Sequence, residues 1–231
     1  MGGRTFVVDG GTSGLGLEVA RLLAREYRTV VLGDVPEEVA LTADALDCEG
    51  QVCDVSQPDQ IARVLGGVRA RYGVIDGLAH CAGVWAGGAL QDNSPETIQR
   101  TVTVNVLGTA YFLHEAIALL RDQGRGNLVY IGAIATEIPR PGIPLYRATK
   151  SFGSSLVESL AEAQGSNSIK VMEIHPGPMH TRLQERVGAE FLDQVYALPE
   201  QVAPEVVRLL TLQPEDLYVS GQKVLRADGR W

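Results

Sequence analysis

Cysteine and basic side chains are scarce in this sequence of 231 residues. Its three cysteines, Cys48, Cys53 and Cys81, are odd in number and lack the spacing of metal ligands, so we expect reduced thiols and no metal site. Acidic side chains outnumber basic ones by 28 to 20, which gives a net charge of −8, and no run of lysines and arginines offsets it. This balance argues against nucleic acid and anionic membrane surfaces as partners.

Long uninterrupted apolar runs are absent as well. The most apolar stretch, 101–120, contains the polar residues Asn105 and His114 and is interrupted by Gly108, which is typical of a buried helix and not of a membrane span. The first strand-like run begins after only four residues, Met1 to Arg4, which leaves no room for a signal peptide. We therefore expect a cytoplasmic protein.

Short β-branched runs alternate along the chain with segments whose apolar residues recur at helical spacing. This alternation predicts an α/β fold in which a parallel sheet is covered by helices on both faces. With 45% hydrophobic residues, the chain can bury a large core, and we expect one domain over residues 1–231. The seven predicted strands are Thr5–Asp9, Thr29–Asp34, Gly50–Asp54, Gly77–Cys81, Leu128–Gly132, Ile169–His175 and Tyr218–Leu225.

A glycine-rich turn follows the first predicted strand. The segment from Gly10 to Gly16 has a Gly-x3-Gly-x-Gly pattern and leads into an amphipathic helix. Glycine lets the backbone approach a pyrophosphate closely, and the free N–H groups at a helix start attract the anion. A tight turn without a ligand is the alternative, but the position between strand and helix favours a dinucleotide site on a Rossmann-type doubly wound sheet.

An acidic residue, Asp34, ends the second predicted strand. It lies 18 residues after Gly16 (34 − 16), close to where a dinucleotide site places the carboxylate that binds the ribose hydroxyls. A carboxylate there repels a 2′-phosphate, and no arginine directly follows it. The sequence therefore favours NAD over NADP, with a solvent-exposed aspartate of no function as the alternative.

Tyr146 and Lys150 form a candidate proton-transfer pair. A spacing of four residues puts both side chains on one face of a helix. At about 4 Å and an effective dielectric constant of about 20, an ammonium group favours the phenolate by roughly 4 kcal/mol, which brings the phenol pKa from about 10 toward neutral. Such pairs are also common on surface helices, so the pair alone is weak evidence for catalysis.

Together these segments resemble the short-chain dehydrogenase/reductase family, over essentially the whole chain. The glycine turn is similar to the family's Thr-Gly-x3-Gly-x-Gly motif, with Asp9 in place of threonine. Asp54-Val55 resembles the dipeptide that contacts adenine, and Cys81-Ala82-Gly83 resembles the Asn-Ala-Gly segment under the cofactor. The segment from Pro176 to Thr181 is similar to the Pro-Gly-x3-Thr segment that clamps the nicotinamide carboxamide.

This resemblance implies hydride transfer between nicotinamide and a secondary alcohol or ketone. Tyr146 would move the proton, Lys150 would lower the phenol pKa and bind the ribose, and Asn105 would complete a water-mediated relay to the lysine. The implied cofactor is NAD, and the implied cofactor-binding residues are Gly10, Thr12, Ser13, Gly14, Leu15, Gly16, Asp34, Asp54, Val55, Cys81, Ala82, Gly83, Tyr146, Lys150, Pro176, Gly177, Met179 and Thr181.

One catalytic position departs from the family pattern. The family has a serine thirteen residues before the tyrosine, and the sequence has Ala133 there (146 − 13). Losing one such hydrogen-bond donor costs about 10²–10³ in rate. Three explanations are open. The chain is an inactivated variant, the hydroxyl is replaced by Thr136 or by an ordered water, or the natural protein no longer catalyses the reaction. The intact state of the other catalytic positions favours the first explanation.

The expected partners are a small-molecule substrate and further copies of the chain. The helices 95–120 and 146–164 resemble the family's dimerisation helices, which implies a homodimer or homotetramer. A non-catalytic NAD-binding sensor or assembly subunit is the alternative function, and Ala133 is its main support. We hypothesise an apolar or ring-containing alcohol or ketone, because apolar side chains occupy the positions of the family's pocket walls, at Trp85, Ile138, Leu145, Met179 and Leu183.

Overall fold

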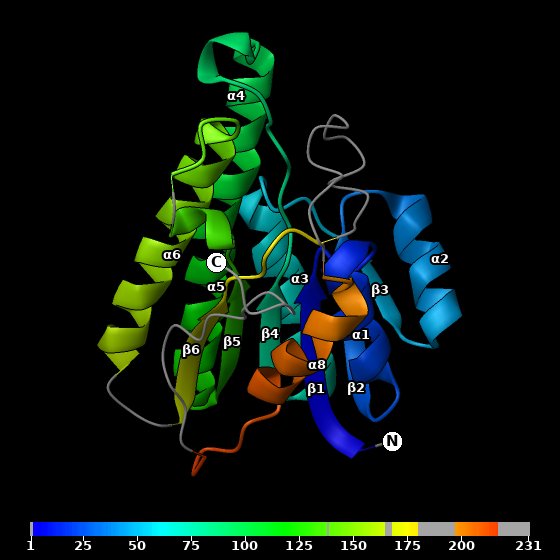
Figure 1. Cartoon of the computed structure of the whole chain (residues 1–231). Helices are drawn as coiled ribbons and strands as arrows, with labels where there is room; N and C mark the ends of the chain where they lie inside the picture. Colours follow the sequence, from blue (N-terminus) through cyan, green and yellow to red (C-terminus); the bar gives the residue numbers. More distant parts are fainter. Residues whose placement is uncertain (1, 138, 165–167, 180–196, 217–231) are drawn as a thin grey trace.

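The computed structural model describes residues 2–137, 139–164, 168–179 and 197–216. Within these residues, six parallel strands form one sheet in the order β3-β2-β1-β4-β5-β6 (Figure 1). The seventh predicted strand, Tyr218–Leu225, lies outside the described residues, so it stays a prediction. The strands are β1 (Gly2–Asp9), β2 (Tyr27–Gly33), β3 (Glu49–Val52), β4 (Gly77–His80), β5 (Gly126–Ile131) and β6 (Ile169–Ile174).

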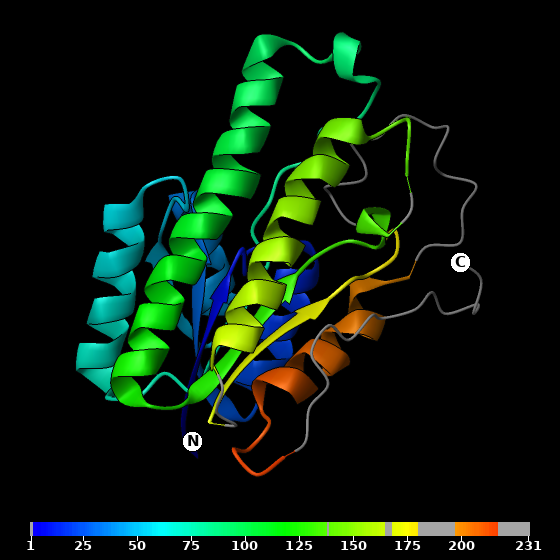
Figure 2. The same ribbon diagram turned by 90° about the vertical axis from the view of Figure 1, so that its left-hand side faces the viewer.

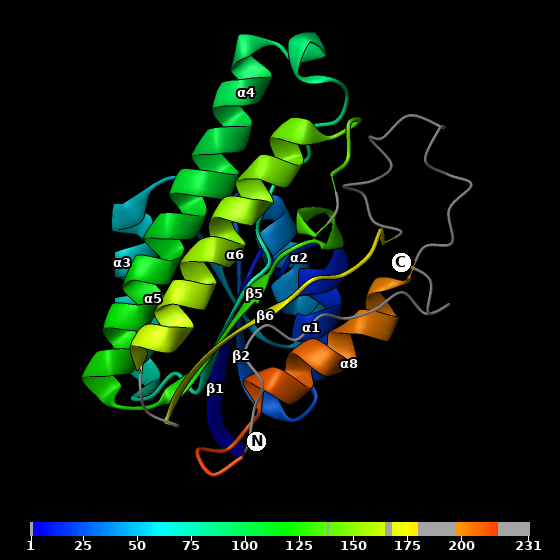
Figure 3. The ribbon, with the colours of Figure 1, turned by 60° about the vertical axis from the view of Figure 1, so that its left-hand side comes forward.

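Helices cover both faces of this sheet, as the alternating pattern predicts. Figure 3 shows α3, α5 and α6 on one side of the strands and α1 and α8 on the other. The order of the strands reverses at β1 and β4, which makes this sheet doubly wound. The helices are α1 (Gly14–Ala24), α2 (Pro36–Leu46), α3 (Pro58–Tyr72), α4 (Pro95–Val102), α5 (Thr109–Gln123), α6 (Pro144–Gln164) and α8 (Pro199–Leu210), with short segments η1 (Leu90–Asp92), η2 (Thr103–Gly108) and η3 (Ile134–Thr136).

Alternate residues of each strand feed two separate cores. On β1, Val7 packs with the helices of one face, while Phe6 and Val8 pack with those of the other, and all three are fully buried. This is the period of two that a strand imposes on its side chains. Burial of apolar surface stabilises the folded state by about 25 cal/mol per Å² removed from water. Burial on both faces of the sheet therefore fixes the positions of the strand ends and of the loops that follow them.

The long apolar stretch belongs to one continuous helical unit, α4–η2–α5, which lies beside α6 (Figure 2). By length and composition this unit could cross a membrane. Its apolar residues, including Phe112, Leu113 and Leu120, are instead buried in the core, as the polar residues within the stretch predict. Gly108 does not interrupt it: a Cβ there would lie 2.9 Å from Val55 Cγ2, so glycine permits close approach of the turn before α3.

Candidate functional site

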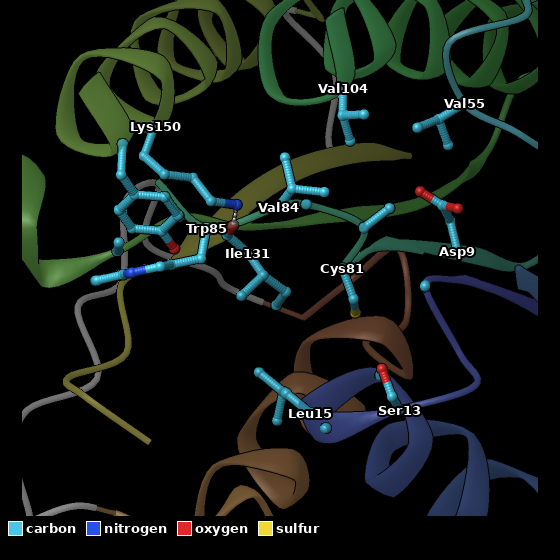
Figure 4. A pocket seen from close by; sticks show the side chains of 18 of the residues that line it. Asp9, Ser13, Leu15, Val55, Cys81, Val84, Trp85, Val104, Ile131 and Lys150 are labelled. Carbon is cyan, nitrogen blue, oxygen red and sulfur yellow. Dashed lines mark hydrogen bonds between the residues drawn. The ribbon is translucent and has the colours of Figure 1, made fainter. Parts of the chain in front are cut away.

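A cleft of about 1040 Å³ opens at the carboxyl ends of the strands (Figure 4). It lies where the strand order reverses between β1 and β4, the usual ligand position in an open parallel sheet. The candidate cofactor residues in the described part of the chain all line it. Thr181 lies outside the described residues, as do the candidate substrate residues Ile138 and Leu183.

The glycine turn forms the cleft's floor at the start of α1. Gly10 has a positive φ of 68°, and a Cβ there would lie 2.6 Å from the Ala82 backbone nitrogen. A Cβ on Gly16 would lie 2.2 Å from the Gly10 carbonyl oxygen. Both positions therefore require glycine. Ser13 is the N-cap of α1, yet its side chain makes no capping hydrogen bond, so its hydroxyl and the first N–H groups of α1 can bind an anion.

Carboxylates gather on the cleft wall made by the residues after β2 and β3. Asp34 is exposed at the end of β2, Glu38 follows on α2, and both line the cleft. Asp54 also lines it, but one of its oxygens accepts a hydrogen bond of 2.9 Å from the Ser56 backbone N–H. The residues that this wall contributes, 33–35, 38 and 53–56, include no lysine or arginine.

A buried aspartate–histidine pair lies beside the glycine turn, and its aspartate, Asp9, lines the cleft. Asp9 and His80 end the neighbouring strands β1 and β4 in register, and Asp9 Oδ2 lies 2.5 Å from His80 Nδ1. The other ring nitrogen lies 3.0 Å from the Thr109 hydroxyl, and the ring stacks on Phe112 at 4.8 Å. His80 is therefore a hydrogen-bonded core residue, and its pairing with Asp9 was not predicted from the sequence.

Helix α6 brings Tyr146 and Lys150 into the cleft together, as their spacing predicts. Lys150 is 5% exposed and donates a 2.8 Å hydrogen bond from Nζ to the Ile131 carbonyl oxygen. Its ammonium also lies 5.1 Å from the centre of the Tyr130 ring, a cation–π distance. Tyr146 is 8% exposed, and its ring packs against Trp85 with the ring centres 4.6 Å apart.

Burial dominates the protonation of this pair. It raises the pKa of the Tyr146 phenol, whereas the sequence-based expectation was that Lys150 lowers it. It also lowers the pKa of Lys150 to about 8, with Cys81 and Asp9 partly offsetting the effect. Desolvation disfavours the charged form of both side chains, and this cost was not visible in their spacing. Burial likewise raises the pKa of the Cys81 thiol, which keeps it protonated.

Asn105 supports the wall of the cleft by hydrogen bonds but does not line the cleft. It lies in η2, a π-helical segment, and its side chain is 1% exposed. Its Oδ1 accepts from the Val84 N–H at 2.8 Å, while Nδ2 donates to the Val84 carbonyl at 2.9 Å and to the Thr149 hydroxyl at 3.1 Å. Asn105 is not among the described residues that line the cleft. It therefore positions the strand-end segment and α6, and the water-mediated relay stays a prediction.

Ala133 lies where the family's serine is expected, beside the tyrosine. It lines the cleft and packs in one cluster with Ala135, Ile143 and Tyr146. Thr136, considered above as a replacement, donates its hydroxyl to the Ala133 carbonyl at 2.9 Å and lies 3.0 Å from His175 Nδ1. Because Thr136 is absent from the described cleft lining, its hydroxyl does not replace the missing serine.

Apolar side chains form the end of the cleft beside Tyr146. Trp85 and Met179 line it as predicted, but Leu145 does not. Leu145 precedes Tyr146 on α6, and successive helical residues point about 100° apart, so the two side chains face different directions. Ile134 and Ile143 also line the cleft, and neither was predicted from the sequence. The Pro-Gly pair at 141–142, a turn signal just before α6, could have drawn attention to Ile143.

The buried ammonium predicts a pH-dependent stability. Lys150 has a pKa near 10.5 when unfolded and about 8 when folded, so the folded state holds fewer protons between these values. Its contribution to the free energy of unfolding is therefore lowest below pH 8 and rises by about 3 kcal/mol up to pH 10.5. The variant Lys150→Met lacks this rise. Urea unfolding of both proteins at pH 7 to 10.5 measures it, and a pH-independent difference between them contradicts the assignment.

Comparison with known proteins places this architecture in one family. Residues 4–191 match the short chain dehydrogenase family. The chain is 30% identical to carbonyl reductase family member 4 of Xenopus tropicalis, over 98% of this chain and 97% of the relative.

Two solved structures share the fold. One is the 3-ketoacyl-(acyl-carrier-protein) reductase of Brucella melitensis complexed with NADH, with a TM-score of 0.87, 20% identity and 96% of each chain covered. The other is an actinorhodin polyketide ketoreductase with NADPH, with a TM-score of 0.85, 23% identity, and 99% and 98% of the two chains covered. With the family match over most of its length, the chain belongs to the short-chain dehydrogenase/reductase family of oxidoreductases.

Proposed function

We propose that this protein interconverts a ketone and a secondary alcohol with a nicotinamide dinucleotide as the redox partner. The observation that carries the proposal is that α6 delivers Tyr146 and Lys150 into the same cleft whose floor is the glycine turn. The residues fit a dinucleotide, because the turn is closed to any side chain at Gly10 and Gly16, and α1 begins there. When bound, the nicotinamide supplies or accepts the hydride.

The chain's own residues handle the proton. In the reductive direction, the Tyr146 hydroxyl donates a hydrogen bond to the substrate's carbonyl oxygen and gives it a proton as the carbonyl carbon receives the hydride. Because burial raises the phenol pKa, the hydroxyl is protonated at neutral pH, as this direction requires. Lys150, held by the Ile131 carbonyl, favours the phenolate that the transfer leaves behind. Turnover is tested by the loss of NADH absorbance with ketones.

We propose NAD(H) as the preferred cofactor. The carboxylates of Asp34 and Glu38 line the wall after β2, and a 2′-phosphate there would meet like charge. Because Asp34 is exposed, solvent weakens the repulsion, and we expect a preference of about tenfold in Kd, or roughly 1.4 kcal/mol. Calorimetry with NADH and NADPH measures it, and tighter NADPH binding contradicts the role of Asp34.

A matched pair of variants tests the source of this preference. Asp34→Asn removes the charge and keeps the shape, so it should narrow the ratio of the two Kd values. Glu37→Gln removes one charge from the neighbouring helix position, which does not line the cleft, and should leave the ratio nearly unchanged. Equal effects of the two variants would indicate that the preference comes from the overall negative charge of this region and not from contact between Asp34 and the ribose.

We propose an apolar, ring-sized substrate. Beside Tyr146, the cleft presents Trp85, Ile134 and Ile143. Burial of apolar substrate surface against these side chains contributes about 25 cal/mol per Å². A panel of cyclic and aromatic ketones should therefore be reduced faster than short polar ones, and the reverse order would reject the proposal.

A non-catalytic NAD-binding sensor is the second candidate, and Ala133 favours it because a catalytic hydroxyl is missing. The two functions differ in what Ala133→Ser does. A gain in turnover supports an oxidoreductase, whereas cofactor binding without turnover in either protein supports a sensor.

We further propose a homodimer or homotetramer. Leu107 of η2 and Phe152 of α6 are 43% and 39% exposed, and α4–α5 and α6 lie side by side (Figure 2). Large exposed apolar side chains on neighbouring helices are typical of an interface. Light scattering should give a multiple of the 24.8 kDa chain mass. Phe152→Glu should shift the mass toward the monomer, and a monomeric parent chain contradicts the proposal.

A further inference from the structure

His175 is a buried ionisable side chain that the proposed mechanism does not use. It directly follows β6 and precedes Pro176 and Gly177, which line the cleft. Its ring is 2% exposed and is absent from the described cleft lining, so it lies behind the wall. Because a buried polar ring without partners costs stability, its partners indicate what holds it there.

The Nδ1 side of the His175 ring faces η3, the short segment that begins after Ala133. Nδ1 lies 3.0 Å from the Thr136 hydroxyl, and this hydroxyl donates a 2.9 Å hydrogen bond to the Ala133 carbonyl. Because a hydroxyl has only one hydrogen, Nδ1 donates to the Thr136 oxygen. The Glu137 carboxylate lies farther away, at 3.4 Å from Nδ1. One hydroxyl thus links His175 to Ala133, which packs with Tyr146.

The Nε2 side of the ring faces β6 and α6. Nε2 lies at an ion-pair distance of 2.7 Å from Glu173 Oε2 on β6, and 3.4 Å from the Ser154 hydroxyl on α6. Glu173 is 2% exposed, and breaking a buried ion pair is costly because it leaves an unpaired charge. Glu173 therefore holds the His175 ring with Nδ1 turned toward η3.

The main chain closes tightly around the same ring. A Cβ on Gly132 would lie 2.9 Å from His175 Cδ2 and 3.0 Å from Nε2, so the chain that enters η3 passes directly against the ring. The Ile134 N–H donates a 3.0 Å hydrogen bond to the Pro176 carbonyl. The two cleft walls that follow β5 and β6 therefore meet at His175.

The segment η3 is also tied to the helix that carries Tyr146. Arg147 follows Tyr146 on α6 and donates a 3.0 Å hydrogen bond from a guanidinium nitrogen to the Thr136 carbonyl. Figure 3 shows α6 packed beside β5 and β6. Thr136 therefore connects His175 both to Ala133 and to the start of α6.

We propose that His175 is a positioning residue that sets the placement of Ala133 and of the wall after β6 relative to Tyr146. The inference rests on the proposed function, because this placement aligns the substrate's carbonyl carbon with the nicotinamide. His175 touches no reactant and transfers no proton. It acts through Thr136 on Ala133, and through its own main chain on Pro176.

Thr136→Val tests the link because it removes the hydroxyl between His175 and Ala133 and keeps the size of the side chain. Since a misplacement of about 1 Å can cost up to about 10²-fold in rate, kcat/KM for a ketone should fall on the order of tenfold. A misplaced wall should raise KM and lower kcat together, whereas a smaller folded fraction lowers kcat at unchanged KM. Thr136→Ser keeps the hydroxyl and should restore most of the loss.

His175→Gln tests the ring itself. The glutamine amide can take the place of Nε2 beside Glu173, so the buried carboxylate keeps a partner, while nothing replaces Nδ1. The loss should resemble that of Thr136→Val. The double variant should lose no more than the weaker single variant, because both changes break the same link.

Thr211→Val is the matched control. The Thr211 hydroxyl also donates a 2.9 Å hydrogen bond to a carbonyl, that of Val207, but it lies at the end of α8, outside the described cleft lining. This variant should leave both kcat and KM unchanged.

The outcomes distinguish the inference from the proposed function. The role of His175 is overturned, and the oxidoreductase left intact, if Thr136→Val loses no more than Thr211→Val or lowers kcat at unchanged KM. Losses that add in the double variant, or a Thr136→Ser variant as impaired as Thr136→Val, overturn it as well. No turnover in any of these proteins, with NADH still bound, overturns the proposed function and the inference with it.

Discussion

Replacing Tyr146 with phenylalanine is expected to lower kcat for ketone reduction on the order of 10³-fold, with cofactor affinity nearly unchanged. A positioned proton donor contributes about 10²–10⁴ to a rate. The phenol hydroxyl has no hydrogen-bond partner among the described residues, so its removal leaves no buried group unpaired. The ring still packs against Trp85, and stability should change little. The loss is therefore assigned to proton transfer and not to folding.

Tyr130→Phe is the matched control for this experiment. Tyr130 is fully buried, its hydroxyl also lacks a partner, and it lies against Gly153 of α6, outside the cleft lining. Its ring faces the Lys150 ammonium at 5.1 Å, and phenylalanine preserves this contact. Activity should stay within a few-fold of the parent. Turnover in Tyr146→Phe within tenfold of the parent would remove Tyr146 from the proposed mechanism.

The parts of the site that the sequence could predict are those determined by short-range spacing. The glycine turn, Asp34 at the end of β2, and Tyr146 four residues before Lys150 are all found in the cleft. Each depends on local geometry: a strand end, a helix start or one helical turn. Such features follow from the residues themselves and need no knowledge of which strands are neighbours.

The features that the sequence could not predict depend on strand pairing and burial. Asp9 and His80 meet because β1 and β4 are neighbours in register, and 71 residues separate them in the chain. The phenol pKa rises because the packing of α6 against the sheet removes water from Tyr146, a cost that spacing does not reveal. Leu145 was placed in the pocket because it occupies a position of the family's pocket walls, but it does not line the cleft.

Ala133→Ser is expected to raise kcat/KM by about ten- to a hundredfold. Ala133 is 8% exposed, lines the cleft and has an extended backbone (φ −157°, ψ 141°), so serine fits there without strain. The new hydroxyl lies in the same cluster as Tyr146 and can donate to the same carbonyl oxygen. The expected gain is smaller than the roughly 10²–10³ of a lone donor, because the Tyr146 hydroxyl already donates to the same oxygen in the proposed mechanism. Steady-state kinetics with a cyclic ketone and NADH measures it.

The control for this gain is Ala135→Ser, which adds the same hydroxyl two residues away. Ala135 is buried in the same cluster and also lines the cleft, so the two variants differ in position and not in polarity. A gain confined to position 133 indicates a donor aimed at the reacting oxygen. Equal gains at both positions indicate only a more polar cleft. Bound NADH without turnover in the parent and in Ala133→Ser favours the sensor, because the restored hydroxyl then completes a site that still performs no chemistry.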